Sequence, residues 1–385
     1  MSRRHGAVSA AVSSGPSGLL GSRYPGIWFA PGRVNLMGGP DYNEVFVLPF
    51  ALPAGVYAAA SRRRDGQIAM TSRQAGTDPV VLSIAALQPG SVSGWAAPAA
   101  GVAWALREAG CLAGGADITI DADLPMGAGL SSSAALECSV ALALTGLYGV
   151  AVPQPELAAL ARRAENDFIG VPTGIMDQLA AMLCRAGHAL LLDCRSGEGT
   201  TVPLELAKAG LALVLIDTRV RRTLADSRYA SRRQACRDAA ALLGMRSLRD
   251  AIGDAAALER LPEPLRRRAG HVIAENQRVL AAAKLLRRGD PAGIGGLLTA
   301  SHISLREEFE VSWPQADAAV AAAVGAGAIG ARMTGGGFGG CVIALVPTDR
   351  CAHVRQAVNE RFAHQRWPSP RYMNATPSGA ARRIR

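Results

Sequence analysis

The sequence predicts a mixed α/β protein of roughly two domains. Its 385 residues suffice for domains of ordinary size, and 49% of them are hydrophobic, as expected of a chain that buries cores. Segments with the two-residue period of a strand and segments with the spacing of a helix both occur, and glycine-rich turns separate them. Helices and strands are therefore both expected to contribute to the fold.

A strand that leads into a helix through a glycine-rich turn is predicted first. Residues 118–124, ITIDADL, alternate strictly between apolar and polar side chains, as a half-buried strand does. The following segment, PMGAGLSSSAALECSVALALTGLYG, has four large apolar residues at helical spacing: Leu136, Val140, Leu144 and Leu147. The helix is expected to begin among residues 130–133.

Further elements are predicted downstream. A helix should run from 155 to about 168 with Pro155 in its first turn, and the turn-forming residues of GVPTG, 170–174, should end it. The apolar run LALVLIDT, 211–218, predicts a buried strand, and the segment at 221–244 predicts an arginine-rich helix. A second glycine-rich turn should precede another buried strand at 341–346.

The expected domain organisation has three parts. Residues 1–22 are dominated by Ser, Gly and Ala, and we expect a disordered leader there, since no compact apolar region with a small-residue cleavage site is present. A boundary is expected in the polar stretch CRSGEGT, which gives domains at 23–203 and 204–385. No apolar run reaches about 18 residues, so no membrane partner is expected.

Cysteine usage and charge limit the function classes. The seven cysteines are scattered without a C-x-x-C pair, which favours free thiols in a reducing cytoplasm over a structural zinc site. The net charge of +10 and pI near 9.7 suit an anionic small substrate as well as nucleic acid. We expect no nucleic-acid partner, because few aromatic residues are interleaved with the arginines and no nucleic-acid module is recognisable.

The turn at 127–133 has the chemistry of a phosphate loop. Its glycines allow close backbone approach, and the first N–H groups of the following helix would point at an anion. It is not a Walker A loop, because no G-K-[ST] follows. The alternative is a tight turn between strand and helix with solvent-facing serines.

Two carboxylates and an arginine could complete a phosphoryl-transfer site. Glu165 lies near the end of a predicted helix, and Asp177 follows twelve residues later, beyond a Gly/Pro turn. They could serve as metal ligand and base, with Arg33 as the counter-ion of the catalytic aspartate. The alternative is a surface glutamate and a helix-capping aspartate.

Three ordered motifs resemble those of the GHMP small-molecule kinases: APGRVNL at 30–36, LPMGAGLSSSAALE at 124–137 and ARMTGGGFGGC at 331–341. The segments VPTGIMDQ, VRRTLADSRYASRRQAC and PSGA are similar to the galactokinase branch of that family. The resemblance covers about residue 27 to the C-terminus. It implies an N-terminal domain like ribosomal S5 domain 2, a ferredoxin-like C-terminal domain, and an active site in the cleft between them.

The resemblance also implies roles for single residues. Asp177 matches the catalytic aspartate and Arg33 its partner, while Ser133 and Glu165 match the ligands of Mg²⁺. The residues that match the ATP site are Pro125, Met126, Gly127, Ala128, Gly129, Leu130, Ser131, Ser132 and Ser133, with Trp95 near the adenine although its W-x-N-Y pattern reads WAAP here. The implied sugar-binding residues are Arg33, Gly39, Asp41, Gly174, Asp177, Tyr229, Gly336 and Gly337.

The sequence departs from the galactokinase pattern at residues 38–40. Typical members read G-E-H-T-D-Y-N, whereas this chain reads GGPDYN and lacks the glutamate and histidine that read the sugar's C6 end. A lost hydrogen-bond partner typically costs about 0.5 to 1.5 kcal/mol. Arg222 and Arg228 also replace a common histidine and glutamate, so we expect them near the substrate; the alternative is that both are solvated.

The sequence therefore predicts an ATP- and Mg²⁺-dependent kinase for the anomeric (C1) hydroxyl of a galactose-like sugar. The departure favours a sugar that is extended or anionic at C6, such as an octose 8-phosphate of antibiotic biosynthesis, and the alternative is ordinary galactose. A monomer or weak dimer in the cytoplasm is expected. Two rivals from other classes are a sugar sensor that binds sugar and ATP without turnover and a basic nucleic-acid-binding protein.

Overall fold

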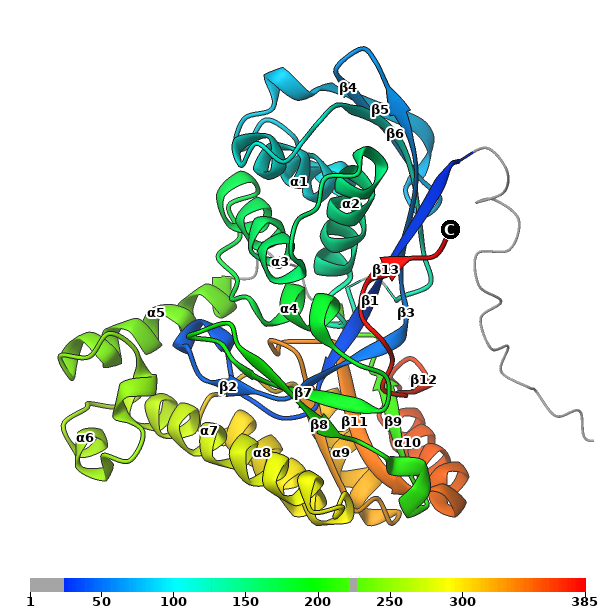
Figure 1. Cartoon of the computed structure of the whole chain (residues 1–385). Helices are drawn as coiled ribbons and strands as arrows, with labels where there is room; N and C mark the ends of the chain where they lie inside the picture. Colours follow the sequence, from blue (N-terminus) through cyan, green and yellow to red (C-terminus); the bar gives the residue numbers. More distant parts are fainter. Residues whose placement is uncertain (1–23, 126, 222–226) are drawn as a thin grey trace, which may run out of the picture.

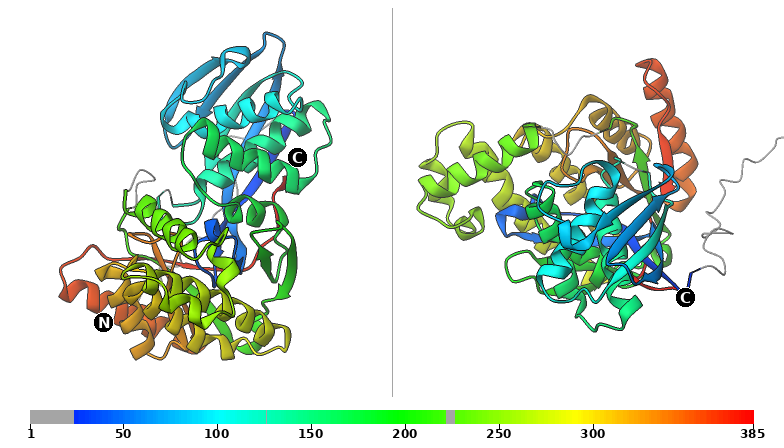
Figure 2. Two further views of the ribbon diagram at one scale, coloured as in Figure 1. Left: turned by 90° about the vertical axis from the view of Figure 1, so that its left-hand side faces the viewer. Right: turned by 90° about the horizontal axis from the view of Figure 1, so that it is seen from above.

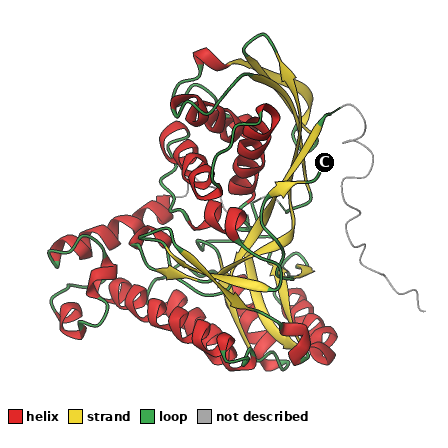
Figure 3. Cartoon of the chain, in the orientation of Figure 1, coloured by secondary structure: helices red, strands yellow, loops and turns green. Residues whose placement is uncertain are grey.

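A computed structural model describes residues 24–125, 127–221 and 227–385. Within them, three sheets carry helices packed against them (Figure 3), so the predicted α/β class is confirmed. The leader predicted at 1–22 lies outside the described residues. Among the helices of the described part, none is long and apolar enough to span a membrane.

The largest sheet has six strands in the order β13-β1-β3-β6-β4-β5. All neighbours are antiparallel except β4 and β6, which are parallel. The strands are β1 (Gly26–Asn35), β3 (Pro49–Arg63), β4 (Gln67–Ser72), β5 (Gly76–Ser83), β6 (Gly115–Ala122) and β13 (Arg382–Arg383). The C-terminal strand β13 lies beside β1, so the two ends of the described chain meet at one edge of this sheet (Figure 1).

Four helices pack together against this sheet (Figures 1 and 2): α1 (Ala97–Glu108), α2 (Ser132–Tyr148), α3 (Gln154–Arg163) and α4 (Met176–Leu183). The central helix α2 contacts β1 and β3, and the four apolar residues that predicted it are buried. The helix predicted at 155–168 is α3 followed by a π-helical turn, Ala164–Phe168. Such turns are frequent at functional sites.

A three-stranded sheet follows, with the order β2 (Phe46–Val47), β7 (His188–Asp193) and β8 (Gly199–Pro203). The remaining sheet is antiparallel, with the order β10 (Gly330–Thr334), β11 (Cys341–Pro347), β9 (Leu211–Asp217) and β12 (Arg371–Asn374). The strands predicted at 211–218 and 341–346 are β9 and β11. The boundary at 203/204 remains a prediction, since β13 returns to the first sheet.

Six helices belong to the part of the chain that contains this last sheet: α5 (Ser227–Leu242), α6 (Ala255–Glu259), α7 (Leu265–Arg287), α8 (Gly295–Glu307), α9 (Pro314–Gly325) and α10 (Cys351–His364). Helices α8 and α9 contact β10, and α9 and α10 contact β11. The arginine-rich helix that the sequence predicted at 221–244 corresponds to α5, and residues 222–226 of that range lie outside the described residues.

A buried ion pair joins this part of the chain to the loop after β1. Glu275 of α7 and Arg332 of β10 are at most 1% exposed, and the carboxylate Oε1 lies 3.4 Å from the Arg332 Nη1. Arg332 donates to the carbonyl oxygens of Leu36 and Gly38, while Glu275 accepts from the Gly38 N–H. Burial alone would raise the pKa of Glu275, but Arg332 and other neighbouring cations hold it at about 2.

Replacing Arg332 by leucine should lower the free energy of unfolding by up to about 3 kcal/mol, because it removes one of the two arginines paired with the buried Glu275; the other, Arg278, keeps its Nε 2.7 Å from Glu275 Oε2. Urea unfolding measures this loss. Arg350→Leu, at an exposed position before α10, is the control and should change stability little. Equal stability of the two variants would show that the buried pair does not hold the two parts together.

Candidate active site

A cavity of about 660 Å³ is lined by both halves of the chain. Its walls come from β1 and the loop after it, the N-terminus of α2, the π-helical turn, the start of α4, helix α5 and the turn after β10. The predicted site residues that line it are Arg33, Gly39, Asp41, Trp95, Gly127, Gly129, Ser131, Ser132, Ser133, Glu165, Gly174, Asp177, Tyr229 and Gly336.

Arg33 and Asp177 lie at the centre of the site. A β-bulge between Pro31 and Arg33 interrupts the pairing of β1 with β3, and bulges redirect side chains. The Arg33 Nε and Nη2 donate to Asp177 Oδ1 at 2.8 and 2.7 Å, and the Ser131 hydroxyl donates to Oδ2 at 2.6 Å. The arginine side chain is 6% exposed and that of Asp177 30%, so the held carboxylate still faces the cavity.

The phosphate-loop segment is tied to the same arginine. Arg33 donates from Nη1 to the carbonyl of Gly129 at 2.8 Å and from its backbone N–H to that of Leu130 at 3.1 Å. Ser131 has left-handed backbone angles and directly precedes α2. The first amides of a helix have no partner within it, so the N-terminus of α2 offers donors and the positive end of its dipole to a phosphate in the cavity.

The third glycine-rich motif packs against this loop, backbone to backbone. A Cβ at Gly340 would lie 2.9 Å from the carbonyl oxygen of Ala128, and one at Gly335 would lie 3.2 Å from that of Gly129. Both glycines have positive φ angles, which side chains disfavour. The motif therefore allows the second half of the chain to approach the loop that would hold the phosphates.

Ser133 and Glu165 form a pair of oxygen donors suited to Mg²⁺. The Ser133 hydroxyl lies 3.3 Å from Glu165 Oε1, while Oε2 accepts from Thr173 at 2.8 Å and from Gln178 at 3.0 Å. Mg²⁺ is commonly held by one or two carboxylates together with substrate phosphates. This pair of oxygen donors fits that ion. Among the described residues, no three or more His, Cys, Asp or Glu side chains lie together as a complete metal site.

A second carboxylate, Glu137, lies behind this pair. It is fully buried on α2, and the Gln178 amide that donates to Glu165 donates its other hydrogen to Glu137 Oε2, also at 3.0 Å. The other oxygen of Glu137 has no partner among the described residues. Burial, and then the negative charge of Glu165, raises the pKa of Glu137 well above its usual range.

Asp41 lines the cavity beside the segment that leads into α4. Its Oδ2 accepts from the backbone N–H of Met176 at 2.9 Å, and its carboxylate lies so close to Gly174 that a Cβ there would be 2.0 Å from it. Burial and the nearby Asp177 raise the pKa of Asp41. The ring of Tyr229 meets that of Tyr42 edge to face, with centroids 5.7 Å apart.

The loop at 38–40 lines the cavity without a polar side chain. The N–H of Gly38 donates to Glu275, and its carbonyl accepts from Arg332 at 3.3 Å and from Asn35 at 3.2 Å. The Gly38 polar groups are thus engaged by the protein. Gly39 and Pro40 contribute no side-chain polar group to the cavity.

The structure leaves some predicted residues out of the cavity lining. The described ones are Pro125, Ala128, Leu130, Arg228 and Gly337. Ala128 and Leu130 are buried, and the Arg228 guanidinium stacks on the ring of Phe338 at 4.5 Å. Met126 and Arg222 lie outside the described residues.

Sequence reasoning missed several lining residues. In the N-terminal half they include Ser72, Gln74 and Pro98, and in the C-terminal half Arg232, Leu305, Phe309 and Val311. Arg232 lies within the quoted segment VRRTLADSRYASRRQAC but was not assigned a role. No motif marks the others, because they reach the cavity through tertiary packing. Thr173 and Gln178 were quoted within VPTGIMDQ, and their polar type beside Asp177 was a signal that could have assigned them to the site.

Comparisons with known proteins agree with this geometry. The family model "GHMP kinases N terminal domain" matches residues 98–185, and "GHMP kinases C terminal" matches residues 282–364. The chain belongs to the GHMP kinases. A third model, "Galactokinase galactose-binding signature", matches residues 19–62 and places the chain in the galactokinase branch.

Individual relatives are similar over nearly the whole chain. A galactokinase of Streptomyces coelicolor is 47% identical over 98% of this chain and 99% of its own length, and one of Mycobacterium tuberculosis is 46% identical over 86% and 91%. The structure of Lactococcus lactis galactokinase complexed with galactose superposes with a TM-score of 0.86 at 31% identity, covering 93% of this chain and 94% of that one.

The chain is therefore a galactokinase-like sugar phosphotransferase with the two-domain GHMP kinase fold, as the sequence predicted. Mevalonate kinase shares the fold alone, with a TM-score of 0.66 at 17% identity. The comparisons do not confirm the expected sugar extended or anionic at C6. They support the alternative, ordinary galactokinase, better.

Glu137→Gln should flatten the loss of stability with rising pH. With its raised pKa, the folded carboxyl keeps a proton that the unfolded chain releases above its ordinary value near 4.5. Its contribution to stability is complete below that pH and is lost by up to about 1.4 kcal/mol per pH unit above it. Urea unfolding from pH 5 to 8 measures the slope, with Glu156→Gln on α3 as an exposed control. An unchanged slope for Glu137→Gln would show that this carboxyl is ionised in the folded protein.

Proposed function

We propose that the protein transfers the γ-phosphoryl group of ATP to the anomeric C1 hydroxyl of galactose. The observation that carries this proposal is the Asp177 carboxylate, held by Arg33 and Ser131 beside the phosphate loop and open to the cavity. The galactokinase relatives and the galactose-bound structural neighbour support the choice of sugar.

Asp177 is suited to orient the sugar hydroxyl and to accept its proton. Arg33 fixes the carboxylate, and its positive charge stabilises the negative charge that develops on the hydroxyl oxygen. The same side chain holds the carbonyl of Gly129, so the acceptor and the phosphate loop keep a fixed relation. Transfer then depends mainly on positioning and on stabilisation of charge.

Ser133 and Glu165 would hold Mg²⁺ with the β- and γ-phosphates of ATP. When bound, the ion would neutralise charge on the transferred group. Thr173 and Gln178 hold Glu165 Oε2 and leave Oε1 beside the Ser133 hydroxyl. The amides at the start of α2 would bind phosphate oxygens, and Trp95 lines the cavity where the nucleotide base would contact it.

A second candidate substrate is a galactose-like sugar extended or anionic at C6, such as an octose 8-phosphate. Two observations favour it. Residues 38–40 offer the cavity no side-chain hydrogen bond, and Arg232, with a side chain 14% exposed, lines the cavity. An anionic substituent would be attracted by the charge of Arg232, whose guanidinium also donates to the carbonyls of Phe309 and Glu310.

A coupled assay of ADP formation on galactose, galacturonate and a heptose or octose phosphate separates these candidates. The proposal expects the highest kcat/KM with galactose. A clear preference for a sugar phosphate would establish the second candidate instead. Binding of sugar and ATP without ADP formation would identify a non-catalytic sensor.

Asp177→Asn should lower kcat by about 10² to 10⁴, because the amide cannot accept the hydroxyl proton, while ATP binding is retained. Steady-state kinetics and calorimetry with an ATP analogue measure the two effects. Asp167→Asn is the control, since Asp167 is exposed on the π-helical turn, 57% at its side chain. Wild-type turnover by Asp177→Asn would refute the proposed role of this carboxylate.

A further inference from the structure

Glu44 has a strained backbone directly beside the sugar side of the cavity. It follows the 3-10 turn Asp41–Asn43, and its φ of 59° and ψ of 26° lie in the left-handed region, which side chains disfavour. Its N–H donates to the carbonyl of Asp41 at 2.9 Å and so closes the turn that carries the Asp41 carboxylate. A change in the backbone at Glu44 would therefore move Asp41.

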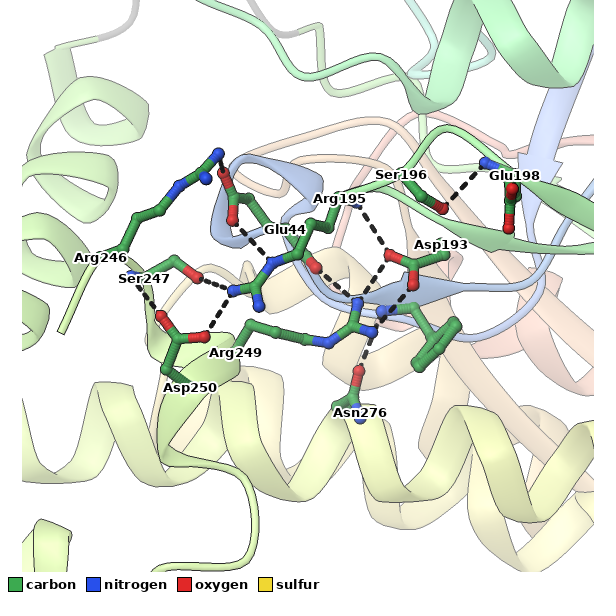
Figure 4. A network of polar contacts seen from close by, with 11 residues as sticks. Glu44, Asp193, Arg195, Ser196, Glu198, Arg246, Ser247, Arg249, Asp250 and Asn276 are labelled. Atoms are coloured by element: carbon green, nitrogen blue, oxygen red, sulfur yellow. Dashed lines mark hydrogen bonds and ion pairs between the residues drawn. The ribbon is translucent and has the colours of Figure 1, made fainter.

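Three arginines donate hydrogen bonds to Glu44 (Figure 4). Arg195 donates from Nε to Glu44 Oε2, and Arg246 donates from Nη2 to Oε1, both at 2.9 Å. Arg249 donates from Nη1 to the Glu44 carbonyl at 2.8 Å. Side chain and backbone are thus held together, which offsets the cost of the left-handed conformation.

Two of these arginines, Arg195 and Arg249, are themselves fixed by other residues, whereas Arg246 has a side chain 76% exposed. Arg195, in the β7–β8 turn, donates to Asp250 at 2.7 Å and to Ser247 at 2.9 Å. Arg249 donates from both terminal nitrogens to the two oxygens of Asp193, at 2.7 and 2.8 Å. Because they are paired in this way, these guanidinium groups are already oriented to bind Glu44.

The far end of the segment is anchored as well. The Phe46 N–H donates to the side-chain oxygen of Asn276 on α7 at 2.9 Å, and the Arg249 guanidinium stacks on the Phe46 ring at 4.2 Å. On the cavity side, Asp41 is fixed by the N–H of Met176. Between these anchors, Glu44 is the residue whose conformation must be held against strain.

We propose that Glu44 and the arginines Arg195, Arg246 and Arg249 form a positioning device that holds the turn at 41–44 so that Asp41 faces the sugar. The proposal rests on the proposed function and on the expectation, which the sequence resemblance implies, that Asp41 contacts the sugar. These four residues do not contact the substrate. They act by raising the fraction of molecules in which the turn at 41–44 has the conformation that binds the sugar. A smaller competent fraction weakens apparent sugar affinity in proportion and leaves the chemistry of bound sugar unchanged.

Partial exposure gives the device a property that a purely structural contact would lack. The side chains of Glu44 and Arg195 are 24% and 34% exposed, so dissolved salt reaches and screens their interaction. Sugar affinity should then fall as ionic strength rises. The effect of salt on ATP affinity should be independent of this network, because the loop expected to bind the phosphates is held by Arg33.

The test uses Glu44→Gln, which keeps the size of the side chain and removes its charge. Its sugar KM should rise about two- to fivefold, in line with the worth of partly exposed ion pairs, while kcat and the KM for ATP stay unchanged. Raising KCl should increase the sugar KM of the wild type but not that of the variant. Asp65→Asn, which removes the ion pair of Asp65 with Arg63 in the β3–β4 turn, is the matched control and should behave as wild type.

Titration calorimetry of galactose and the other sugars with the same variants gives a readout independent of turnover. Unchanged sugar affinity and unchanged salt dependence in Glu44→Gln would overturn the positioning role. A parallel fall of kcat, sugar affinity and thermal stability would also overturn it, since general loosening would explain the data. Sugar binding by the wild type without ADP formation would refute the kinase proposal alone, whereas binding of no sugar would overturn both.

Discussion

The site is built around the Arg33 guanidinium. The guanidinium donates to the Asp177 carboxylate and to the Gly129 carbonyl, and the backbone N–H of Arg33 donates to the Leu130 carbonyl. These contacts join β1, the phosphate loop and the start of α4, which are far apart in sequence. A nearly buried cation requires such partners, so one side chain couples the proposed place of the acceptor hydroxyl to the proposed place of the phosphates.

The sequence predicted the parts of the site that lie in local motifs. The strand–turn–helix pattern placed the phosphate loop at the start of α2, and Ser133, Glu165 and Asp177 meet in the cavity. It could not predict the contacts that form when elements far apart in the sequence pack together. Neither the register shift between β1 and β3 beside Arg33 nor the Glu275–Arg332 pair near Gly38 leaves a periodic signal, because each depends on residues from separate elements.

The loop at 38–40 shows how missing side chains can be interpreted. From sequence alone, the loss of two polar residues favoured a larger sugar. In the structure, the backbone N–H and carbonyl of Gly38 are already bonded to Glu275, Arg332 and Asn35, so the loop lines the cavity as a wall. A wall without side-chain hydrogen bonds is compatible with galactose bound mainly through Asp41 and Asp177, and it does not by itself demand a charged substituent.

In the proposed reaction Asp177 meets the anomeric hydroxyl of the sugar. Phosphorus NMR of the product formed from galactose and ATP tests this contact, because coupling of the phosphorus to a sugar proton identifies the carbon that carries the phosphate. We expect coupling to the anomeric proton. Coupling to the C6 protons would contradict it and would mean that the sugar binds with its other end at Asp177.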